Sequence, residues 1–433
     1  MVRGIVLISS SIADRSAVIG VIGLGYVGLP LALTFAEAGF QVIGFDTDAA
    51  KPAKLAAGQS YLRHIPDARI TGAQRMQATN DFARSAGCDA LIICVPTPLD
   101  AHLQPDLRYI EDTTCAIAPH LATGTLVVLE STTWPGTTVE VVKPLLEASS
   151  PCRLGTDLYL AYSPEREDPG NEQFATRSIP KLVGGADAVS CELAVELYRA
   201  VIEQVVPVSS TQVAEAAKLF ENIFRSVNIA LVNELKVILD RMGLDAHEVI
   251  RAAATKPFGF MPFWPGPGLG GHCIPLDPFY FAWKAKEYGA EARFIELAGE
   301  INRAMPTWVV GKVQDCLNEH SKPLKGSRIL LLGIAYKAEV DDLRESPALV
   351  LLKQLEAKGA RVSYHDPYIP VLPQTRDHGD IAGRDSQPMT SDYDCFVLVT
   401  AHRCFDAESI LSRNVPVVDT RRKLPAHPLV FPA

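Results

Sequence analysis

A glycine-rich segment near the start of the chain constrains its fold more than any other part of the sequence. Residues 17–36 carry no charged side chain and are about as long as a membrane-spanning helix. They contain Gly23, Gly25 and Gly28 in a G-x-G-x-x-G arrangement, followed by Pro30, a composition that one continuous helix would not tolerate. We therefore expect a strand at 18–22, a tight turn and a helix, rather than a signal peptide or membrane segment.

This order of strand, glycines and helix is typical of a dinucleotide-binding site. Gly23 would permit the turn, Gly25 would let a pyrophosphate approach the backbone, and Gly28 would let the helix pack closely on the sheet. Asp46 follows the next predicted strand, eighteen residues after Gly28. A carboxylate there accepts hydrogen bonds from ribose hydroxyls and repels a 2′-phosphate, which favours NAD over NADP.

Short runs rich in Val, Ile and Leu alternate with helical stretches through the first half of the chain. The runs are residues 18–22, 41–45, 90–95, 126–129 and 158–162. This alternation predicts a parallel sheet covered on both faces. The loop at Pro96 and Thr97 leaves the carboxyl end of a predicted strand, where such sheets bind ligands.

A long helix is predicted over residues 209–243, which contain no Pro and no internal Gly. Ser209 and Gln212 fit a capping box, and Gly243 fits a C-terminal stop. A helix of that length, about 50 Å, must bury its apolar stripe on more than one small domain. We expect it to connect two domains and to form the interface of a homodimer, with higher oligomers left open.

The last third of the chain repeats the pattern of the first. Predicted strands lie at 328–332, 361–365, 395–400 and 415–418, with Gly333 after the first and Asp366 after the second. The predicted fold class is α/β, with two Rossmann-like doubly wound domains joined by a helical domain with a long central helix. The expected boundaries are 1–208 for the NAD-binding domain, 209–320 for the helical domain and 321–433 for the C-terminal domain.

Composition excludes some functions and locations. The formal charge of −9 argues against nucleic acid as a partner, because nucleic-acid binding needs a basic face. The nine cysteines are spread singly and without a C-x-x-C pair. That usage is typical of a reducing cytoplasm rather than of a disulfide framework or a zinc finger.

A second informative segment surrounds Cys273. Five of the six residues at 266–271 are Gly or Pro, which allows close approach of a ligand to the backbone. A thiol on such a loop is accessible to substrate; the alternative is a small buried hydrophobe. His272 suggests a metal, but no second ligand cluster exists, so we expect none. Lys218 and Asn222 share one face of the long helix, although a lysine there could simply be solvated.

Six motifs occurring in order resemble those of the UDP-sugar 6-dehydrogenases, over residues 17–422. They are Gly23-Leu-Gly25-Tyr-Val-Gly28-Leu-Pro30, Glu130-Ser-Thr-Thr133, Ser163-Pro-Glu165-Arg166, Lys218 with Asn222, Gly270-Gly-His-Cys273, and Gly333-Ile-Ala-Tyr336-Lys337 through Arg344-Glu-Ser346. Residues 162–170 and 256–280 are most similar to the bacterial UDP-N-acetylglucosamine 6-dehydrogenases of surface-polysaccharide synthesis. Pro169 stands where the UDP-glucose branch has a second Glu, which favours the N-acetylhexosamine branch. Ala338 stands where relatives often carry a second Lys, which weakens the case for an extra phosphate contact and leaves Lys337 unaffected.

The resemblance implies oxidation of a sugar C6 alcohol to a carboxylate with two NAD⁺ per sugar. It implies that Cys273 forms a thiohemiacetal and then a thioester, which water hydrolyses. The other implied roles are oxyanion stabilisation and water binding by Lys218 and Asn222, proton movement by Asp277, acid–base catalysis by Glu165 and water orientation by Thr133. The expected cofactor contacts are Gly23, Gly25, Tyr26, Val27, Gly28, Asp46, Pro96, Thr97, Thr133 and Arg344. The expected substrate contacts are Glu165, Arg166, Lys218, Asn222, Gly270, Tyr336, Lys337 and Arg421.

Three alternatives stay open at this point. The same chemistry could act on UDP-N-acetylmannosamine, UDP-N-acetylgalactosamine or UDP-glucose, because pocket shape decides the epimer. A catalytically inactive nucleotide-sugar-binding protein could share the fold. A two-electron dehydrogenase of the 6-phosphogluconate type could share its outline, but would have no use for Cys273.

Overall fold

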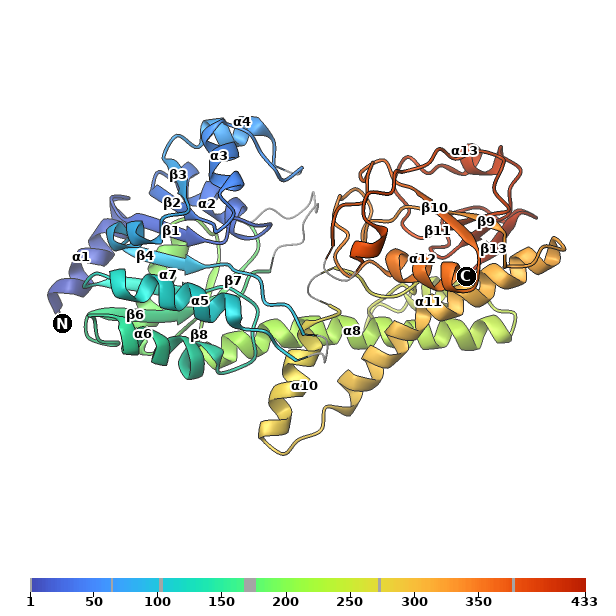
Figure 1. Ribbon diagram of the computed structural model, residues 1–433. Helices are drawn as coiled ribbons and strands as arrows, with labels where there is room; N and C mark the ends of the chain where they lie inside the picture. The colour runs from blue at the N-terminus through green and yellow to red at the C-terminus, as the bar shows by residue number, and fades with distance from the viewer. Residues whose placement is uncertain (1, 64, 101–103, 167–176, 272–273, 376–377) are drawn as a thin grey trace. The chain divides into compact units, whose positions relative to one another are not determined.

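The structure is a computed structural model that describes residues 2–63, 65–100, 104–166, 177–271, 274–375 and 378–433 (Figure 1). These residues form two compact units. The first unit holds residues 1–221 and 279–291, and the second holds residues 222–278 and 292–433.

The first unit is built on an eight-stranded sheet with the strand order β3-β2-β1-β4-β5-β6-β7-β8. The strands are β1 (Val18–Ile22), β2 (Gln41–Phe45), β3 (Met76–Thr79), β4 (Ala90–Ile93), β5 (Thr125–Leu129), β6 (Leu158–Tyr162), β7 (Lys181–Gly185) and β8 (Val205–Val208). Three predicted strands, β1, β2 and β6, are confirmed to the residue. The strand predicted at 90–95 is two residues shorter, and the one predicted at 126–129 begins one residue earlier.

The prediction of a wholly parallel sheet is wrong at one pair, because β6 and β7 run antiparallel. A parallel pair needs a crossover, usually a helix, to return the chain to the same end of the sheet. Residues 163–166 and 177–180, the described parts of the connection, contain no helix. The chain therefore turns back beside β6.

Both faces of this sheet are covered. Helices α1 (Val2–Ala13), α2 (Gly28–Glu37) and α7 (Ala188–Arg199) share a core with alternate strand residues such as Ile19. Strand residues that point to the opposite face, such as Leu91, are also fully buried. The unit's other helical segments are α3 (Ala50–Ala56), α4 (Asp67–Gly72), η1 (Phe82–Gly87), α5 (Arg108–Ile117), η2 (Ala118–His120), the π-helical turn η3 (Thr138–Val142), α6 (Lys143–Ser149) and α10 (Asp277–Glu287), whose first two residues belong to the second unit.

The long helix is observed as α8 (Thr211–Arg241). Its predicted cap at Ser209 is wrong by one residue, because the N–H of Val213 donates to Ser210 Oγ at 3.3 Å, which makes Ser210 the capping residue. Within the described ranges, no helix combines the length and apolarity that a membrane span requires.

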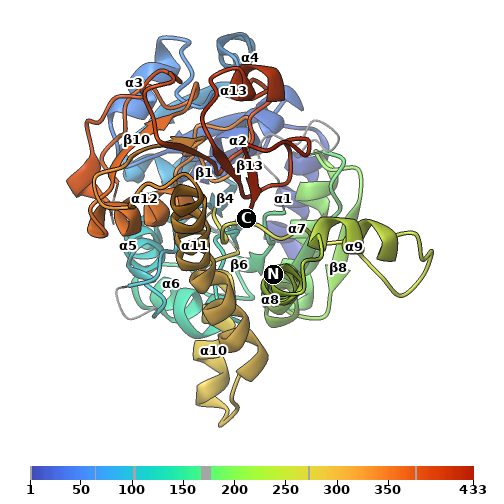
Figure 2. The same cartoon turned by 90° about the vertical axis from the view of Figure 1, so that its right-hand side faces the viewer.

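The second unit carries a five-stranded sheet in which every pair is parallel, in the order β10-β9-β11-β12-β13. Its strands are β9 (Arg328–Leu332), β10 (Arg361–His365), β11 (Cys395–Leu398), β12 (Val417–Asp419) and β13 (Val430–Pro432). The first two were predicted to the residue, β11 and β12 were predicted within three residues at each end, and β13 was missed. Helices α11 (Arg293–Glu319) and α12 (Pro347–Ala357) lie side by side on one face (Figure 2). The remaining segments are α9 (Ala246–Ala253), η4 (Gly379–Ile381) and α13 (Ala407–Leu411). The predicted fold class is thus confirmed.

Candidate active site

The glycine loop has the geometry that a dinucleotide phosphate requires. Gly23 has φ +91°, and a Cβ at Gly28 would lie 2.0 Å from the carbonyl oxygen of Gly23, so only glycine fits there. A Cβ at Gly25 would meet nothing within 4 Å, so this backbone is open to a ligand. The capping position of α2, Val27, offers no side chain to the first turn. In that turn the N–H of Leu29 donates to the carbonyl oxygen of Gly25 at 3.2 Å and Pro30 has no N–H, so the N–H of Gly28 and the positive end of the helix dipole are what the helix offers to a phosphate. These residues fit NAD.

Asp46 lies at the carboxyl end of β2 and is 7% exposed. Its Oδ2 accepts a hydrogen bond from the N–H of Leu24 at 2.9 Å, and Lys51 Nζ lies 2.7 Å from the same oxygen. Asp46 therefore fixes the glycine loop in addition to its predicted contact with ribose. The pairing with Lys51 was not foreseen, because nothing in the order of residues shows which cation folds onto the carboxylate.

The second domain contains a modified copy of this arrangement. Gly333 also has positive φ, and Asp366 Oδ2 accepts hydrogen bonds from the N–H groups of Ile334 and Ala335. Here, however, buried His402 places Nε2 3.1 Å from the same oxygen. Asp366 is thus paired with a fully buried imidazole, whereas Asp46 in the cofactor domain is paired with the partly exposed Lys51.

Thr97, on the loop after β4, is tied to helix α10. Tyr280 is fully buried and donates its hydroxyl hydrogen to the carbonyl oxygen of Thr97 at 2.6 Å. Trp134 stacks on Tyr280, with 6.3 Å between ring centroids. The helix that follows Cys273 in sequence is therefore packed against the loop predicted to contact the cofactor.

Thr133 lies after β5 and is fully buried, yet its Oγ1 has no hydrogen-bond partner among the described residues. An unsatisfied buried hydroxyl is costly, so the position suits a hydroxyl that bonds to a bound molecule. This observation fits the predicted role of Thr133 in orienting water.

Glu165 and Arg166 follow β6 and are both held by neighbouring residues. Glu165 Oε2 lies 3.2 Å from Lys181 Nζ, and its Oε1 accepts from the N–H of Arg166 at 2.6 Å. The Arg166 guanidinium donates to both carboxylate oxygens of Glu221. A substrate contact by Arg166 would therefore have to share this guanidinium with Glu221.

One face of α8 carries three polar residues, of which Glu215 was missed in the sequence. Glu215 and Lys218 are buried, and Asn222 Nδ2 donates to Asp277 Oδ2. Among the described residues, no carboxylate pairs with Lys218. The spacing of three and then four residues places all three on one helix face, and this polar stripe could have been found in the sequence.

Glu215 anchors α8 to the segment that follows Thr133. Its carboxylate accepts hydrogen bonds from the N–H of Gly136 at 2.6 Å and from the N–H and hydroxyl of Thr138 at 2.9 and 2.6 Å. Burial raises the pKa of Glu215 to about 7, although these hydrogen bonds oppose the rise. The folded state therefore binds this proton more tightly than the unfolded state does.

We expect the stability of Glu215→Gln relative to the parent to increase as the pH rises. A carboxyl with a raised pKa in the folded state stabilises that state at low pH, and this contribution disappears as the pH rises from about 4.5 to about 7. Because Gln cannot ionise, the variant does not lose this contribution to the free energy of unfolding, which in the parent falls by about 2 kcal/mol between pH 5 and 8. Urea unfolding of both proteins at pH 5 and 8 measures the change, and an equal difference at the two pH values would contradict it.

The glycine-rich loop before Cys273 lies against the C-terminal domain within the second unit. His272 and Cys273 themselves fall outside the described residues. The N–H of Gly271 donates to the carbonyl oxygen of Arg344 at 3.0 Å, and a Cβ at Gly270 would lie 2.7 Å from the Tyr336 side chain. The structure thus brings together Gly270 and Tyr336, both predicted as substrate contacts, with Arg344, which was predicted as a cofactor contact.

Arg421, near the end of the sequence, also lies against the glycine-rich loop. A Cβ at Gly266 would lie 2.6 Å from Arg421 Nη1, so the guanidinium lies directly against the backbone of the loop. Burial lowers the pKa of Arg421 to about 10, and the side chain stays charged at neutral pH. Half-buried Lys337 adjoins Tyr336, while exposed Arg344 pairs with Asp342 at 2.6 Å.

The loop is held from its other side by two asparagines that sequence reasoning missed. Asn233 Oδ1 accepts from the N–H of Gly266 at 2.9 Å, and Asn233 Nδ2 donates to Asn302 Oδ1 at 2.9 Å. Both side chains are buried. Their partners are distant in sequence, so only the position of Asn233 on the polar face of α8 could have indicated them.

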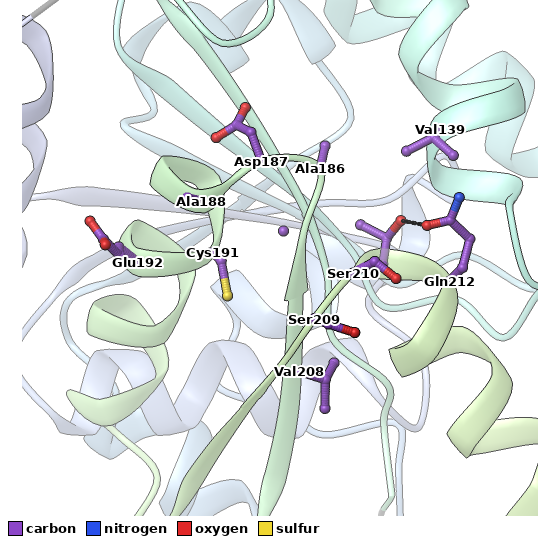
Figure 3. A pocket seen from close by; sticks show the side chains of 12 residues that line it. Val139, Ala186, Asp187, Ala188, Cys191, Glu192, Val208, Ser209, Ser210 and Gln212 are labelled. Atoms are coloured by element: carbon purple, nitrogen blue, oxygen red, sulfur yellow. Dashed lines mark hydrogen bonds between the residues drawn. The ribbon is translucent and has the colours of Figure 1, made fainter.

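A hollow of about 620 Å³ lies elsewhere in the first unit, beside the N-terminal ends of α7 and α8 (Figure 3). The described residues that line it include Asp187 and Glu192 but none of the predicted site residues. Two carboxylates disfavour a nucleotide phosphate, so we do not assign the substrate to this hollow.

Comparison with known proteins connects both sites to one family. Three domain profiles of the UDP-glucose/GDP-mannose dehydrogenase family match the chain: the NAD binding domain over residues 17–202, the central domain over 212–304 and the UDP binding domain over 330–426. The chain is 36% identical over 388 residues to UDP-N-acetyl-D-glucosamine 6-dehydrogenase of Pseudomonas aeruginosa, covering 89% of this chain and 91% of that protein. It is 35% identical over 357 residues to UDP-N-acetyl-D-mannosamine dehydrogenase of Pyrococcus horikoshii, covering 81% and 84%.

The chain is also similar to solved structures of UDP-sugar dehydrogenases. The structure of the Pyrococcus horikoshii UDP-D-ManNAc dehydrogenase matches with a TM-score of 0.83 at 32% identity, over 95% of this chain and 97% of that chain. A UDP-glucose dehydrogenase from Pyrobaculum islandicum matches with a TM-score of 0.83 at 27% identity, over 94% of each chain.

Proposed function

Because the chain belongs to the UDP-glucose/GDP-mannose dehydrogenase family and uses NAD, we propose that it oxidises UDP-N-acetyl-D-glucosamine at C6 to the uronic acid. The observation that carries this proposal is the pair of sites described above. One is a glycine cradle that fits a dinucleotide, and the other is a glycine-rich loop that ends at Cys273 and lies against Tyr336 and Arg421. The three domain boundaries expected from the sequence, 1–208, 209–320 and 321–433, belong to the same proposal.

The proposed mechanism assigns the covalent steps to Cys273. NAD⁺, when bound, accepts a hydride in each of the two oxidations. The Cys273 thiolate adds to the C6 aldehyde, which makes a thiohemiacetal that can be oxidised to a thioester. Water then attacks the thioester carbon, the C–S bond breaks, and the acid leaves while the thiolate is restored.

The remaining residues would stabilise charge and move protons. Lys218 offers a buried cation, and Asn222 an amide, to the oxyanion that forms at C6. Asp277, which Asn222 holds by a hydrogen bond, assists proton transfer at the thiol. Glu165 is the general base for the water that attacks the thioester, and Thr133 orients water near the nicotinamide.

The candidate substrates within the family differ in the epimer of the sugar. Support for UDP-N-acetylglucosamine comes from the Pseudomonas aeruginosa relative, and the Pyrococcus horikoshii relative favours UDP-N-acetylmannosamine as the second candidate. Purified protein with NAD⁺ and each of four UDP-sugars, followed at 340 nm, separates them. We expect the highest kcat/KM for UDP-N-acetylglucosamine, and a substantially higher value for another sugar would overturn this choice.

The product would be an acidic sugar for a surface polysaccharide such as capsule or O-antigen. One relative, 35% identical over 349 residues, is the Staphylococcus aureus protein CapL. The enzyme would act in the cytoplasm, in keeping with the free cysteines of the described residues.

We further propose that a second copy of the chain covers an apolar stripe on α8. The stripe consists of large hydrophobic side chains that are at least 42% exposed: Phe220, Phe224, Leu231, Leu235 and Ile238 on α8, and Met242 directly after its last residue. Exposed apolar surface that follows one helix face for several turns is typical of a protein interface. A single helix stripe can meet its own copy across a two-fold axis, which fits a homodimer.

The double variant Leu231→Glu/Leu235→Glu is expected to be monomeric, because two buried carboxylates on each side of the axis would repel. Light scattering after size exclusion should then give 46.9 kDa where the parent gives twice that mass. Glu196→Lys, which changes a charge on an exposed position of α7, serves as the control and should stay dimeric. A parent protein that is itself monomeric would contradict the proposal.

A further inference from the structure

A buried lysine lies between two glutamates in the first unit. Glu130 directly follows β5, and Glu165 lies three residues beyond β6. Because β7 runs antiparallel to β6, with Gly184 opposite Tyr162, the first residue of β7 lies beside the segment that follows β6. That residue is Lys181. The strand direction that differs from the sequence prediction is what places this cation near Glu165.

The contacts of Lys181 are short and shielded from water. Its Nζ lies 3.2 Å from Glu165 Oε2 and 3.1 Å from Glu130 Oε2, and its side chain is 6% exposed. The same atom lies 5.0 Å from the ring centroid of Tyr198, whose hydroxyl donates to Glu130 Oε1. Lys181 is therefore held by Glu130 and Tyr198 on one side and faces Glu165 on the other.

The charges of this cluster favour an ionised Glu165. Burial alone would lower the pKa of Lys181, but Glu130 and Glu165 outweigh it and keep that pKa above its ordinary value. Burial raises the pKa of Glu130 to about 7, although Lys181 opposes the rise. Cys94 is the other titratable group that acts on Lys181 and Tyr198. The Lys181 ammonium thus lies against both carboxylates, at 3.1 Å from Glu130 and 3.2 Å from Glu165, and an opposite charge at that distance favours an ionised carboxylate.

We propose that Lys181 is a positioning residue that keeps the Glu165 carboxylate ionised and in one orientation for the hydrolysis of the thioester. This inference rests on the role proposed above for Glu165. In that step, the water oxygen bonds to the thioester carbon, Glu165 takes the proton of the water, and the sulfur of Cys273 leaves as a thiolate. Lys181 contacts none of the reacting atoms in this account and acts only through Glu165.

The test is the pH profile of kcat for Lys181→Met, which removes the charge and preserves most of the length. Loss of a cation at this distance should move the acid limb to higher pH by about one unit and lower kcat on that limb about tenfold. KM should change less than threefold. Rapid mixing with NAD⁺ and UDP-N-acetylglucosamine should show a burst of two NADH per site before a slow steady state, because hydrolysis becomes limiting. Lys181→Arg, which preserves the charge, should return the limb toward the parent position.

Two further variants separate positioning from folding. Lys284 is also a buried lysine between two carboxylates, at 2.6 Å from Glu140 and 2.7 Å from Glu287, and Lys284→Met should leave the acid limb in place. If Lys181→Met fails to fold because it leaves Glu130 without its partner, the double variant Lys181→Met/Glu130→Gln removes both charges. It should show the same shift of the acid limb.

An unmoved acid limb in both folded Lys181 variants would overturn the inference. The result for Glu165→Gln distinguishes this failure from failure of the proposed function. If Glu165→Gln shows the burst and slow turnover while the Lys181 variants do not, only the role of Lys181 is wrong. If Glu165→Gln turns over like the parent, the proposed role of Glu165 is wrong.

Discussion

Cys273→Ser is expected to abolish the conversion of UDP-N-acetylglucosamine to the acid while leaving UDP-sugar binding intact. A serine hydroxyl is a far weaker nucleophile than a thiolate, and without a covalent adduct the aldehyde has no hydride to give in the second oxidation. Loss of a catalytic nucleophile typically lowers kcat by about 10³-fold or more. NADH formation measures turnover, and titration calorimetry with the UDP-sugar measures binding.

A matched control for this variant is Cys115→Ser. Cys115 is an exposed thiol on α5 and has no role in the proposed mechanism, so its variant should retain parental kcat. Complete turnover by Cys273→Ser would refute the covalent role. Loss of UDP-sugar binding together with turnover would show that Cys273 supports the pocket rather than the chemistry.

Lys218→Met is expected to lower kcat by about 10²–10³-fold, the effect typical of removing one donor from an oxyanion site. The same change should leave the melting temperature unchanged or raise it. Lys218 is 8% exposed and pairs with no carboxylate of the described residues, and a buried charge without a partner destabilises the fold. Opposite responses of activity and stability are typical of a residue retained for function.

Differential scanning fluorimetry and steady-state kinetics test this pair of responses. Lys284→Met is the comparison, because Lys284 is similarly buried but paired with two glutamates. We expect it to lower the melting temperature with little change in kcat. A destabilised Lys218→Met protein whose activity falls only with its folded fraction would contradict a role in catalysis.

Four of the five strands that were predicted to the residue, β1, β2, β6 and β9, are mainly apolar runs, whereas β10 alternates buried with exposed or half-buried positions. β1, β2 and β6 are bounded by turn residues or charges, and a buried parallel sheet selects for such runs. β7 was missed because its sequence begins with Lys181 and ends with two glycines. Its antiparallel direction depends on a connection that no local pattern describes.

The candidate site likewise contains some features that the sequence predicts and others that it does not. Backbone requirements can be predicted from sequence, since the glycines at 23 and 28 have no tolerated substitute in this geometry. Buried charges cannot, because their partners are distant along the chain: Glu215 bonds to residues 77 and 79 positions away. The role of Lys181 depends on Glu130, a residue of a predicted motif to which the sequence assigned no function.

The amount of NADH formed per UDP-N-acetylglucosamine consumed tests the central claim most directly. Both quantities can be measured in one reaction carried to completion, by absorbance at 340 nm and by chromatography of the nucleotide sugars. A four-electron oxidation through a thioester on Cys273 predicts two NADH per sugar, with the acid as the product. One NADH per sugar, with the aldehyde or a ketone as the product, would contradict the account.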